Sequence, residues 1–507
     1  PRVARSSQAV HCFFAILADA GHVGDTLTDM HEAGVLTRFL PEFEGLRCLV
    51  QREIFHRYTA DVHTLLCLRE LDAVFLSADP ERARYRAALL ETDEPALLYL
   101  VLLLHDIGKQ FGIADHAETG ADLSEKILRR LGVAPSARTL VTQLIRLHLA
   151  MAEFWRKHDL EEPANIERFA ALVGSEPLLR YLYVLTYCDA RATAPDLWNS
   201  YKNALHSQLF LQTLAYFVRL NPQHTQDHLS PQDMLRREIV EKGLIGEDIT
   251  SEELDAHFSL VPERYFQQYG PEDTCLHIRM VNKLLFTITS AHGAGSLSPV
   301  IHWQDNKTKG ISDVTIVTWD RAGLFYKIAG AFSVAGLNIL GAKAISRSDH
   351  IAIDTFHIEK SIKDPLLAEE LRDAFSHNLD EALVQERDLE PAIRAQILRV
   401  AKRPRTAREK LIAAVPVKPK VSVYHDAKLH RTVVELSAGD RIGLLFFLGR
   451  LFYRHHLDIA FARITTENNA AVDTFYLEPF PGEADKTPAE LKALRDDIKA
   501  CLAESPT

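Results

Sequence analysis

An internal repeat constrains the C-terminal half of this 507-residue chain more than any other feature. The pattern Asp-Arg-x-Gly-Leu begins at Asp320 and returns at Asp440, and Asp-Thr-Phe begins at Asp354 and returns at Asp473, an offset of about 120 residues. Each copy places β-rich segments around an amphipathic stretch. This order predicts a tandem of ferredoxin-like βαββαβ units. The expected strands are 313–318, 352–359, 432–437, 457–466 and 471–478, and the expected helices are 324–335, 365–377, 444–456 and 487–502.

The residues before the repeat predict a different architecture. Apolar residues recur there with a helical period, so we expect an all-helical domain followed by an α+β part. The expected organisation is a helical domain at 1–230, a helical connector at 231–305, a first repeat at 306–392, a basic linker at 393–420 and a second repeat at 421–507. The basic linker is typical of a solvated connection, and a nucleic-acid contact is the weaker alternative.

Charge and composition exclude several classes of protein. The net charge of -11 argues against a general nucleic-acid binder, which needs a basic face. The longest apolar run, 97–104, is too short to span a bilayer, and no signal peptide is visible, so we expect a cytoplasmic protein without membrane contact. The six cysteines are scattered without Cys-x-x-Cys spacing, which suits a reducing compartment. The chain opens at Pro1 rather than methionine, and we expect a fragment of a longer protein.

Histidines and aspartates lie on apolar stripes of the helical part. Asp189 continues a leucine stripe that begins at Leu178, and His148 continues an apolar stripe that begins at Val141. Taken alone, each has a structural interpretation, as a helix-end aspartate or a hydrogen-bonded core histidine. Several such groups that converge can share a divalent cation, which removes the cost of burying them.

The whole set favours a metal centre. His105 and Asp106 follow eight consecutive apolar residues, and Lys109 would bring a positive charge beside them. Nitrogen and oxygen ligands without a thiolate favour Mg or Mn, with Fe or Zn as alternatives. Six ligands suggest two ions bridged by Asp106, and a single ion is the second interpretation. The predicted ligands are His63, His105, Asp106, His116, His148 and Asp189.

These residues resemble a known pattern. His63, His105-Asp106 and Asp189 look like the HD-domain phosphohydrolases, and His116 and His148 match the additional histidines of two-metal members. The resemblance is closer to the HD domain of the bacterial bifunctional uridylyltransferase/uridylyl-removing enzymes, the GlnD family, and runs from about residue 25 to 480. The segments that carry it are HRYTADVHT (56–64), HDIGK (105–109), DHAETGA (115–121), LTYCDARAT (185–193), LWNSYK (197–202) and PERYFQQYGPEDTCLHI (262–278).

The resemblance implies a reaction and a partner. It implies metal-dependent hydrolysis of the uridylyl-tyrosine phosphodiester on the uridylylated PII nitrogen-signalling protein, with release of UMP. Asp106, Lys109, His116 and His148 would form the catalytic group, and Arg191 and Asn199 would contact the substrate. The Gly-Gly-Ser and paired-aspartate motif of the family's nucleotidyltransferase domain is not found in this chain, so we expect uridylyl transfer to belong to the full-length parent.

The two repeats resemble ACT domains, which sense small molecules. The family's loop reads Asp-Arg-Pro-Gly-Leu-Leu, and both loops here, 320–325 and 440–445, lack its proline. The glycine would let the chain turn into a helix N-terminus whose N–H groups can hold a carboxylate. The resemblance implies glutamine as effector. The expected effector residues are Asp320, Gly323, Asn338, Asp440, Gly443 and Asp458.

Two alternatives remain at this stage. A (p)ppGpp hydrolase also joins an HD domain to an ACT module, but the two repeats and the segments at 197–202 and 262–278 favour the uridylyl-removing interpretation. The other alternative is an amino-acid sensor with an inactive HD site, and the complete ligand set argues against it.

Overall fold

The chain forms two compact units, which we describe separately. The first comprises 1–156 and 166–224, and the second comprises 157–165 and 225–507. The computed structural model describes residues 6–50, 58–112, 115–193, 198–220, 230–246, 249–290, 298–306, 311–359, 365–401, 417–467 and 470–503.

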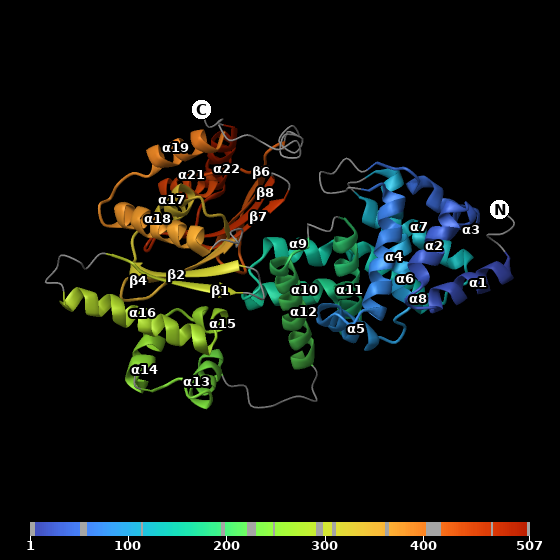
Figure 1. Ribbon diagram of the computed structural model, residues 1–507, viewed down its shortest axis with the longest axis horizontal. Helices are drawn as coiled ribbons and strands as arrows, with labels where there is room; N and C mark the ends of the chain where they lie inside the picture. The colour runs from blue at the N-terminus through green and yellow to red at the C-terminus, as the bar shows by residue number, and fades with distance from the viewer. Residues whose placement is uncertain are drawn as a thin grey trace. The chain divides into compact units, whose positions relative to one another are not determined.

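The first unit is helical throughout its described residues, as the sequence predicts (Figure 1, blue to green). Its centre is α6, because seven of its eight apolar residues are buried and α4, α8 and α11 all pack against it. Prolines at the first position of α5 and α8 begin those helices without losing a backbone hydrogen bond. The helices are α1 (Ser7–Ala18), α2 (Val23–Glu32), α3 (Val35–Phe39), η2 (Pro41–Leu46), α4 (Ala60–Leu76), α5 (Pro80–Leu90), α6 (Leu97–Leu104), η3 (Ile107–Phe111), α7 (His116–Arg130), α8 (Pro135–Leu147), α9 (Ala150–Lys157), α10 (Pro163–Val173), α11 (Glu176–Thr193) and α12 (Ser200–Leu220).

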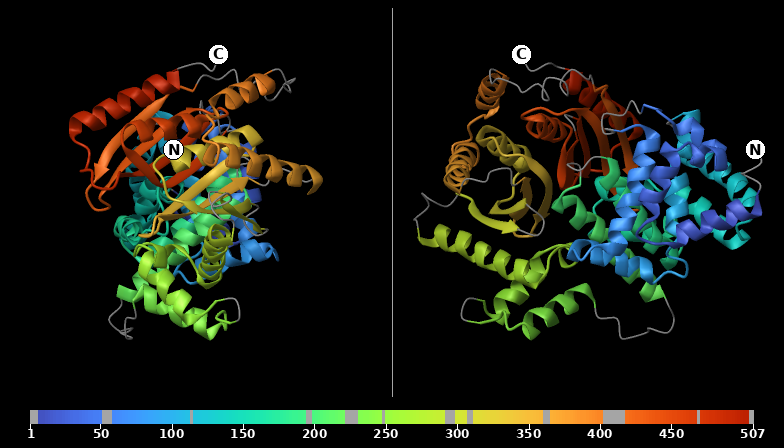
Figure 2. Two further views of the ribbon diagram at one scale, coloured as in Figure 1. Left: turned by 90° about the vertical axis from the view of Figure 1, so that its left-hand side faces the viewer. Right: turned by 45° about the vertical axis from the view of Figure 1, so that its right-hand side comes forward.

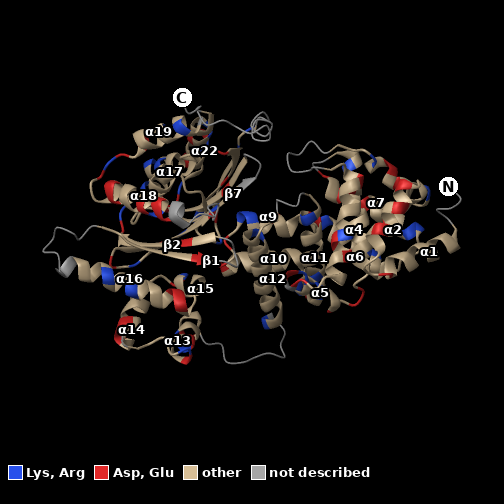
Figure 3. Ribbon diagram, in the orientation of Figure 1, with Lys and Arg blue, Asp and Glu red and all other residues tan. Residues whose placement is uncertain are grey.

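Acidic and basic residues are mixed on the helices of this unit. Helices α4, α7 and α11 each carry both signs (Figure 3), so charge marks none of these three as a nucleic-acid contact. Among the described residues, no single helix is both long and apolar enough to cross a membrane.

The second unit begins with helices and continues as a sheet. The helices are α13 (Pro231–Glu241), α14 (Ser251–Leu260), α15 (Tyr265–Gln268) and α16 (Pro271–Ser290). A capping box between Thr250 and Glu253 begins α14, since each side chain binds the other's backbone N–H. These helices occupy the segment expected as a connector, but β1 already begins at Val300, inside that segment.

Eight strands form one antiparallel sheet in the order β1-β2-β4-β3-β7-β8-β6-β5. Each repeat contributes four strands, and the repeats join where Gly341–Lys343 of β3 pairs with Phe461–Arg463 of β7. The strands are β1 (Val300–Asn306), β2 (Ile311–Trp319), β3 (Ile339–Ser346), β4 (Ile351–Glu359), β5 (Lys420–Asp426), β6 (Arg431–Gly439), β7 (Leu457–Glu467) and β8 (Ala470–Pro479).

The predicted βαββαβ order is wrong, because each repeat runs ββαββα. The outer strand of each half is the first strand of a hairpin at the start of the repeat, β1 with β2 and β5 with β6, and not a strand after its second helix. The predicted α+β character and the first helix of each repeat agree with the structure. The helices of the repeats are α17 (Leu324–Ala335), α18 (Pro365–Leu383), α19 (Glu390–Ala401), α21 (Leu444–Arg454) and α22 (Pro488–Ala503).

Helices cover the two faces of the sheet unequally. The larger core joins one face to α17, α18, α19, α21 and α22. On the other face, α15 and α16 pack against apolar residues of β1 to β4 (Figure 2). Both repeats begin their first helix with a glycine, Gly323 or Gly443, at φ 79°, where other residues are strained. Each loop therefore runs directly into the N-terminus of a helix, α17 or α21.

Candidate functional site

The six predicted ligands come from five places in the helical unit. His63 lies in the first turns of α4, His105 and Asp106 follow α6, and His116 begins α7. His148 directly follows α8, and Asp189 lies near the end of α11. All except Asp189 have at most 6% of their surface exposed. Apolar packing of the helices therefore brings these groups into one buried cluster.

Asp106 lies at the centre of that cluster, between two groups of imidazoles. Its Oδ2 is 3.6 Å from Nε2 of His63 and 3.4 Å from Nε2 of His105. Its Oδ1 is 3.6 Å from Nε2 of His116 and 3.8 Å from Nε2 of His148. One carboxylate oxygen thus faces each group, which is the arrangement that a bridging ligand requires.

Within each group, other ligand atoms also lie close to one another, without a contribution from Asp106. The Asp189 Oδ1 lies 2.9 Å from Nε2 of His63 and 3.7 Å from Nε2 of His105. On the other side, Nε2 of His116 and Nε2 of His148 are 3.2 Å apart. Ligands at right angles around a cation with bonds of 2.1 Å are about 3 Å apart. The spacing in both groups is therefore that of ligands around a small divalent cation.

Backbone hydrogen bonds orient two of the imidazoles. His105 donates from Nδ1 to the Leu102 carbonyl at 2.7 Å, and His148 donates from Nδ1 to the Ile145 carbonyl at 2.7 Å. Because a carbonyl can only accept, Nδ1 carries the proton in both rings and Nε2 is left to face the cluster. Such bonds set the tautomer of histidines that bind metals.

Electrostatics in the cluster favour cations. Burial opposes a charge on His105, but Asp106 and Asp189 outweigh it and raise its pKa to about 9. Burial also opposes ionisation of Asp106, yet His105 and Lys109 hold its pKa well below the usual range. Burial and the charge on His105 lower the pKa of His148 to about 4. The carboxylates therefore stay ionised and need a positive partner, which a divalent cation supplies.

Comparison with known proteins agrees with this chemistry. No family model matches the chain. Curated relatives named bifunctional uridylyltransferase/uridylyl-removing enzyme do match. Those of Erythrobacter litoralis, Caulobacter vibrioides and Methylococcus capsulatus are each 30% identical, over 484, 508 and 489 residues, which are 95%, 99% and 94% of this chain. The chain is homologous to these enzymes. It spans about half the length of the curated relatives it matches, between 50% and 53% for these three.

Lys109 and Gly108 support the histidine and aspartate cluster of this chain. Nζ of Lys109 is 2.7 Å from Oδ2 of Asp106, and the lysine is 8% exposed. A Cβ at Gly108 would lie 2.1 Å from the backbone oxygen of His116. Only glycine allows η3 to approach α7 this closely. Gly108 thereby helps to place His116, a part that no local pattern in the sequence indicates.

Cys67 also belongs to the first group and was not predicted. Its Sγ is 3.5 Å from Nε2 of His63, one helical turn earlier on α4. Burial and the nearby Asp189 and Asp106 raise the pKa of the thiol well above its usual value. A neutral thiol is a poor ligand compared with a thiolate, so the raised pKa favours a donor set of nitrogen and oxygen. The spacing His63-x-x-x-Cys67 was the available signal.

The two predicted substrate residues lie in other settings. Arg191 follows Asp189 by two residues, and its Nε is 3.7 Å from Oε2 of Glu70. Oδ1 of Asn199 accepts from the backbone N–H of Lys202 at 2.9 Å, which caps the first turn of α12. The structure thus gives Asn199 a structural task, and substrate contact by either residue stays a prediction.

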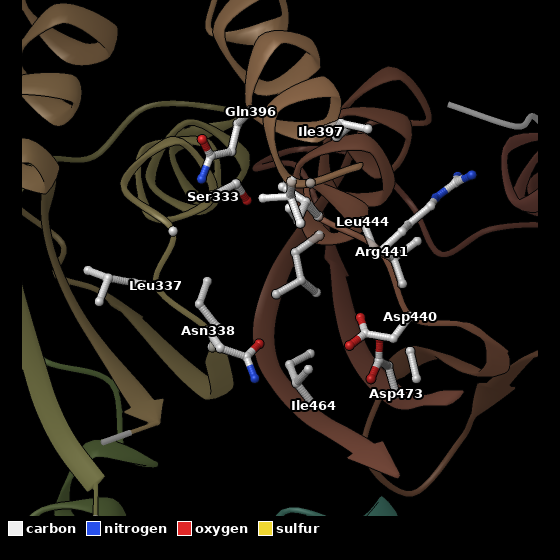
Figure 4. A pocket seen from close by; sticks show the side chains of 17 residues that line it. Ser333, Leu337, Asn338, Gln396, Ile397, Asp440, Arg441, Leu444, Ile464 and Asp473 are labelled. Atoms are coloured by element: carbon white, nitrogen blue, oxygen red, sulfur yellow. The ribbon is translucent and has the colours of Figure 1, made fainter. Parts of the chain in front are cut away.

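The predicted effector residues fall into two sets in the second unit. The loop with Asp440 and Gly443 lines a cavity of about 590 Å³ together with Asn338 (Figure 4). The loop with Asp320 lies beside Asp458 around a cavity of about 50 Å³, and Gly323 belongs to the same loop. Each set combines a loop of one repeat with the start of an inner strand of the other.

Proposed function

We propose that this chain hydrolyses the uridylyl-tyrosine phosphodiester of the modified PII protein and releases UMP. The observation that supports it most is the Asp106 carboxylate, which faces two imidazole groups with its two oxygens. Homology to enzymes named for uridylyl removal supplies the substrate. The reaction, the partner and a cytoplasmic setting all belong to this proposal.

The cluster would hold the cations through its own donors. His63, His105, Asp106 and Asp189 would hold one ion, and His116 and His148, with Asp106 shared, would hold another. A bound divalent cation supplies neutralisation of phosphoryl charge and a lower pKa for water. The mixed nitrogen and oxygen donors favour Mg or Mn, with Fe or Zn as alternatives.

Two side chains of the cluster, Lys109 and His148, would act at the phosphodiester. Lys109 sits 2.7 Å from Asp106 and would stabilise negative charge that develops on the phosphoryl oxygens. Nδ1 of His148 is held by a backbone carbonyl, so its Nε2 cannot turn away from the cluster. The buried surroundings of the cluster keep bulk water from screening these charges.

Regulation by glutamine through the tandem repeat is the second part of the proposal. Two sequence-related loops at helix N-termini, one of them beside a large cavity, support it. The residues proposed to contact the effector are Asp320, Gly323, Asn338, Asp440, Gly443 and Asp458.

The test measures UMP released from uridylylated PII with Mn, with Mg and after chelation. We expect release that depends on the cation and that His105→Ala abolishes. His11→Ala is the matched control, because His11 is exposed on α1. The same preparation is offered (p)ppGpp. Cleavage of (p)ppGpp without UMP release would replace the proposal with an alarmone hydrolase. If the cation-loaded protein catalysed neither reaction, the remaining interpretation would be an amino-acid sensor with an inactive HD site.

A further inference from the structure

A second group of side chains that can bind a metal lies at the outer edge of the sheet. Its members are His425, His430 and Asp485, and each offers a ligand atom within 4.8 Å of those of the other two. β5, which carries His425, is the last strand in the order of the sheet, and His430 and Asp485 are exposed. None of the three belongs to the helical cluster or to the repeated loops, so hydrolysis and effector control leave them without a role.

The alternation of β5 places His425 on the helix-covered face of the sheet. Val421 and Val423 pack against the larger core, to which α22 also contributes, and His425 follows them at the same spacing of two. Nδ1 of His425 is buried and has no hydrogen-bond partner among the described residues. No such bond therefore fixes the tautomer of the ring, and either nitrogen can offer its lone pair to an ion.

The turn of the β5–β6 hairpin carries the second histidine. Oδ1 of Asp426 accepts from the backbone N–H groups of Lys428 at 3.0 Å and Leu429 at 3.2 Å, which fixes the turn. His430 then adopts a left-handed conformation with φ 52°, which costs energy for a residue with a side chain. In this conformation, a ring nitrogen of His430 lies within reach of His425.

The loop before α22 carries the carboxylate and is held on both sides of Asp485. Before it, Oε2 of Glu483 lies 3.2 Å from Nζ of Lys486, so the charge of this lysine is paired with Glu483. After it, the side chain of Thr487 accepts from the N–H of Glu490 and begins α22. The carboxylate of Asp485 is thus left to face the two histidines.

The separation of these groups fits a shared cation better than a direct contact. Nε2 of His425 is 3.7 Å from Oδ2 of Asp485, which is too long for a hydrogen bond. Ligands of a tetrahedral zinc ion, with bonds of about 2.1 Å, are about 3.4 Å apart. A water molecule could also bridge two such groups, but it gives no reason for a third one, His430, in a strained conformation beside them.

We propose that His425, His430 and Asp485 bind one divalent transition-metal ion, for which zinc is the probe, and that this ion ties the β5–β6 turn to the loop before α22. Two nitrogen donors favour zinc over magnesium, which prefers oxygen ligands. Three protein ligands leave one position of a tetrahedral site to solvent. The site is independent of the proposed hydrolysis, because it shares no residue with the helical cluster.

The experiment compares zinc binding to the whole chain and to His425→Ala by equilibrium dialysis and elemental analysis. The parent should hold one zinc ion more than His425→Ala, whatever the helical cluster binds, and Asp485→Asn should bind this ion at least about tenfold more weakly. Hydrogen–deuterium exchange locates the ion, since zinc should slow exchange at 426–431 and 480–487 and magnesium should not. His11→Ala, an exposed change on α1, is the control and should alter neither result.

Several outcomes would overturn the inference. Equal zinc content in the parent and His425→Ala would remove the site, and so would protection confined to other segments or produced equally by magnesium. Circular dichroism melting without metal verifies the fold, and Asp485→Asn, which changes an exposed side chain, keeps the test decisive if His425→Ala does not fold. UMP release is measured separately, so failure of the hydrolase proposal would appear there and not in the zinc count.

Discussion

Buried carboxylates in the two units are in opposite states. Burial raises the pKa of any carboxyl, but in the helical unit His105 and His63 reverse this and hold the pKa of Asp189 well below its usual value. In the sheet, burial and the neighbouring Asp320 raise the pKa of Asp354, and burial and Asp440 raise that of Asp473. The helical unit thus keeps Asp106 and Asp189 ionised, whereas among the described residues no cationic partner is found for Asp354 or Asp473 of the sheet. The same residue type serves two purposes, and its neighbours decide which.

The largest expected effect comes from removing charge at the centre of the cluster. Asp106→Asn should lower UMP release by more than about 100-fold, because even residues that only orient metal ligands cost 10–100-fold. Bound Mn, measured by elemental analysis, should fall with it. Asp29→Asn, an exposed change on α2, should leave both unchanged. Full metal content in Asp106→Asn would contradict a bridging role.

Gly108→Ala tests whether the helical site depends on a close backbone approach. The new methyl group would meet the His116 carbonyl and should destabilise the unit by about 1–3 kcal/mol, with reduced UMP release since His116 must move. Urea unfolding measures the first effect. Gly439→Ala is the control, because a Cβ there meets nothing within 4 Å. Equal free energies of unfolding for the two variants would show that α7 can move away from the new methyl group without a loss of stability.

Asp354→Asn tests whether a buried carboxyl of the sheet has a raised pKa, in contrast to those of the helical unit. A carboxyl whose pKa is higher in the folded protein than in the unfolded chain contributes its full stability below the unfolded pKa of about 4. This contribution is lost as the pH rises toward the pKa of the folded protein. The parent should therefore lose stability from pH 4 upward, as Asp354, which Asp320 and Asp458 face, loses its proton. The variant should be more stable than the parent by about 1 kcal/mol or more at pH 8. Urea unfolding at pH 5 and pH 8 measures the difference. A variant that is less stable at pH 8 would mean that Asp354 is ionised and paired.

Cys67→Ser should have the smallest effect. If the thiol is neutral and does not bind the cation, metal content should be unchanged and UMP release should stay within about threefold of the parent. Elemental analysis and the UMP assay measure both. Loss of the metal in this variant would add a thiolate to the donor set and shift the preference toward zinc.

Local patterns predicted much of the fold. The apolar period of 324–335 corresponds to α17 with the same bounds, and the run 97–104 became the buried helix α6. The hairpin strands β1 and β5 were missed, because both are edge strands with many partly exposed residues and lack a continuous apolar pattern. Missing them also produced the wrong strand order in the repeats.

The sequence alone predicted which residues would meet in the buried cluster. Helical stripes point His148 and Asp189 inward, and the repeated loops place a glycine before each first helix, since these features depend only on local periodicity and backbone freedom. Tertiary structure alone decided that Asp106 faces two imidazole groups and that Gly108 lets α7 approach. Such distances arise from packing between segments far apart in the chain, and no local pattern encodes them.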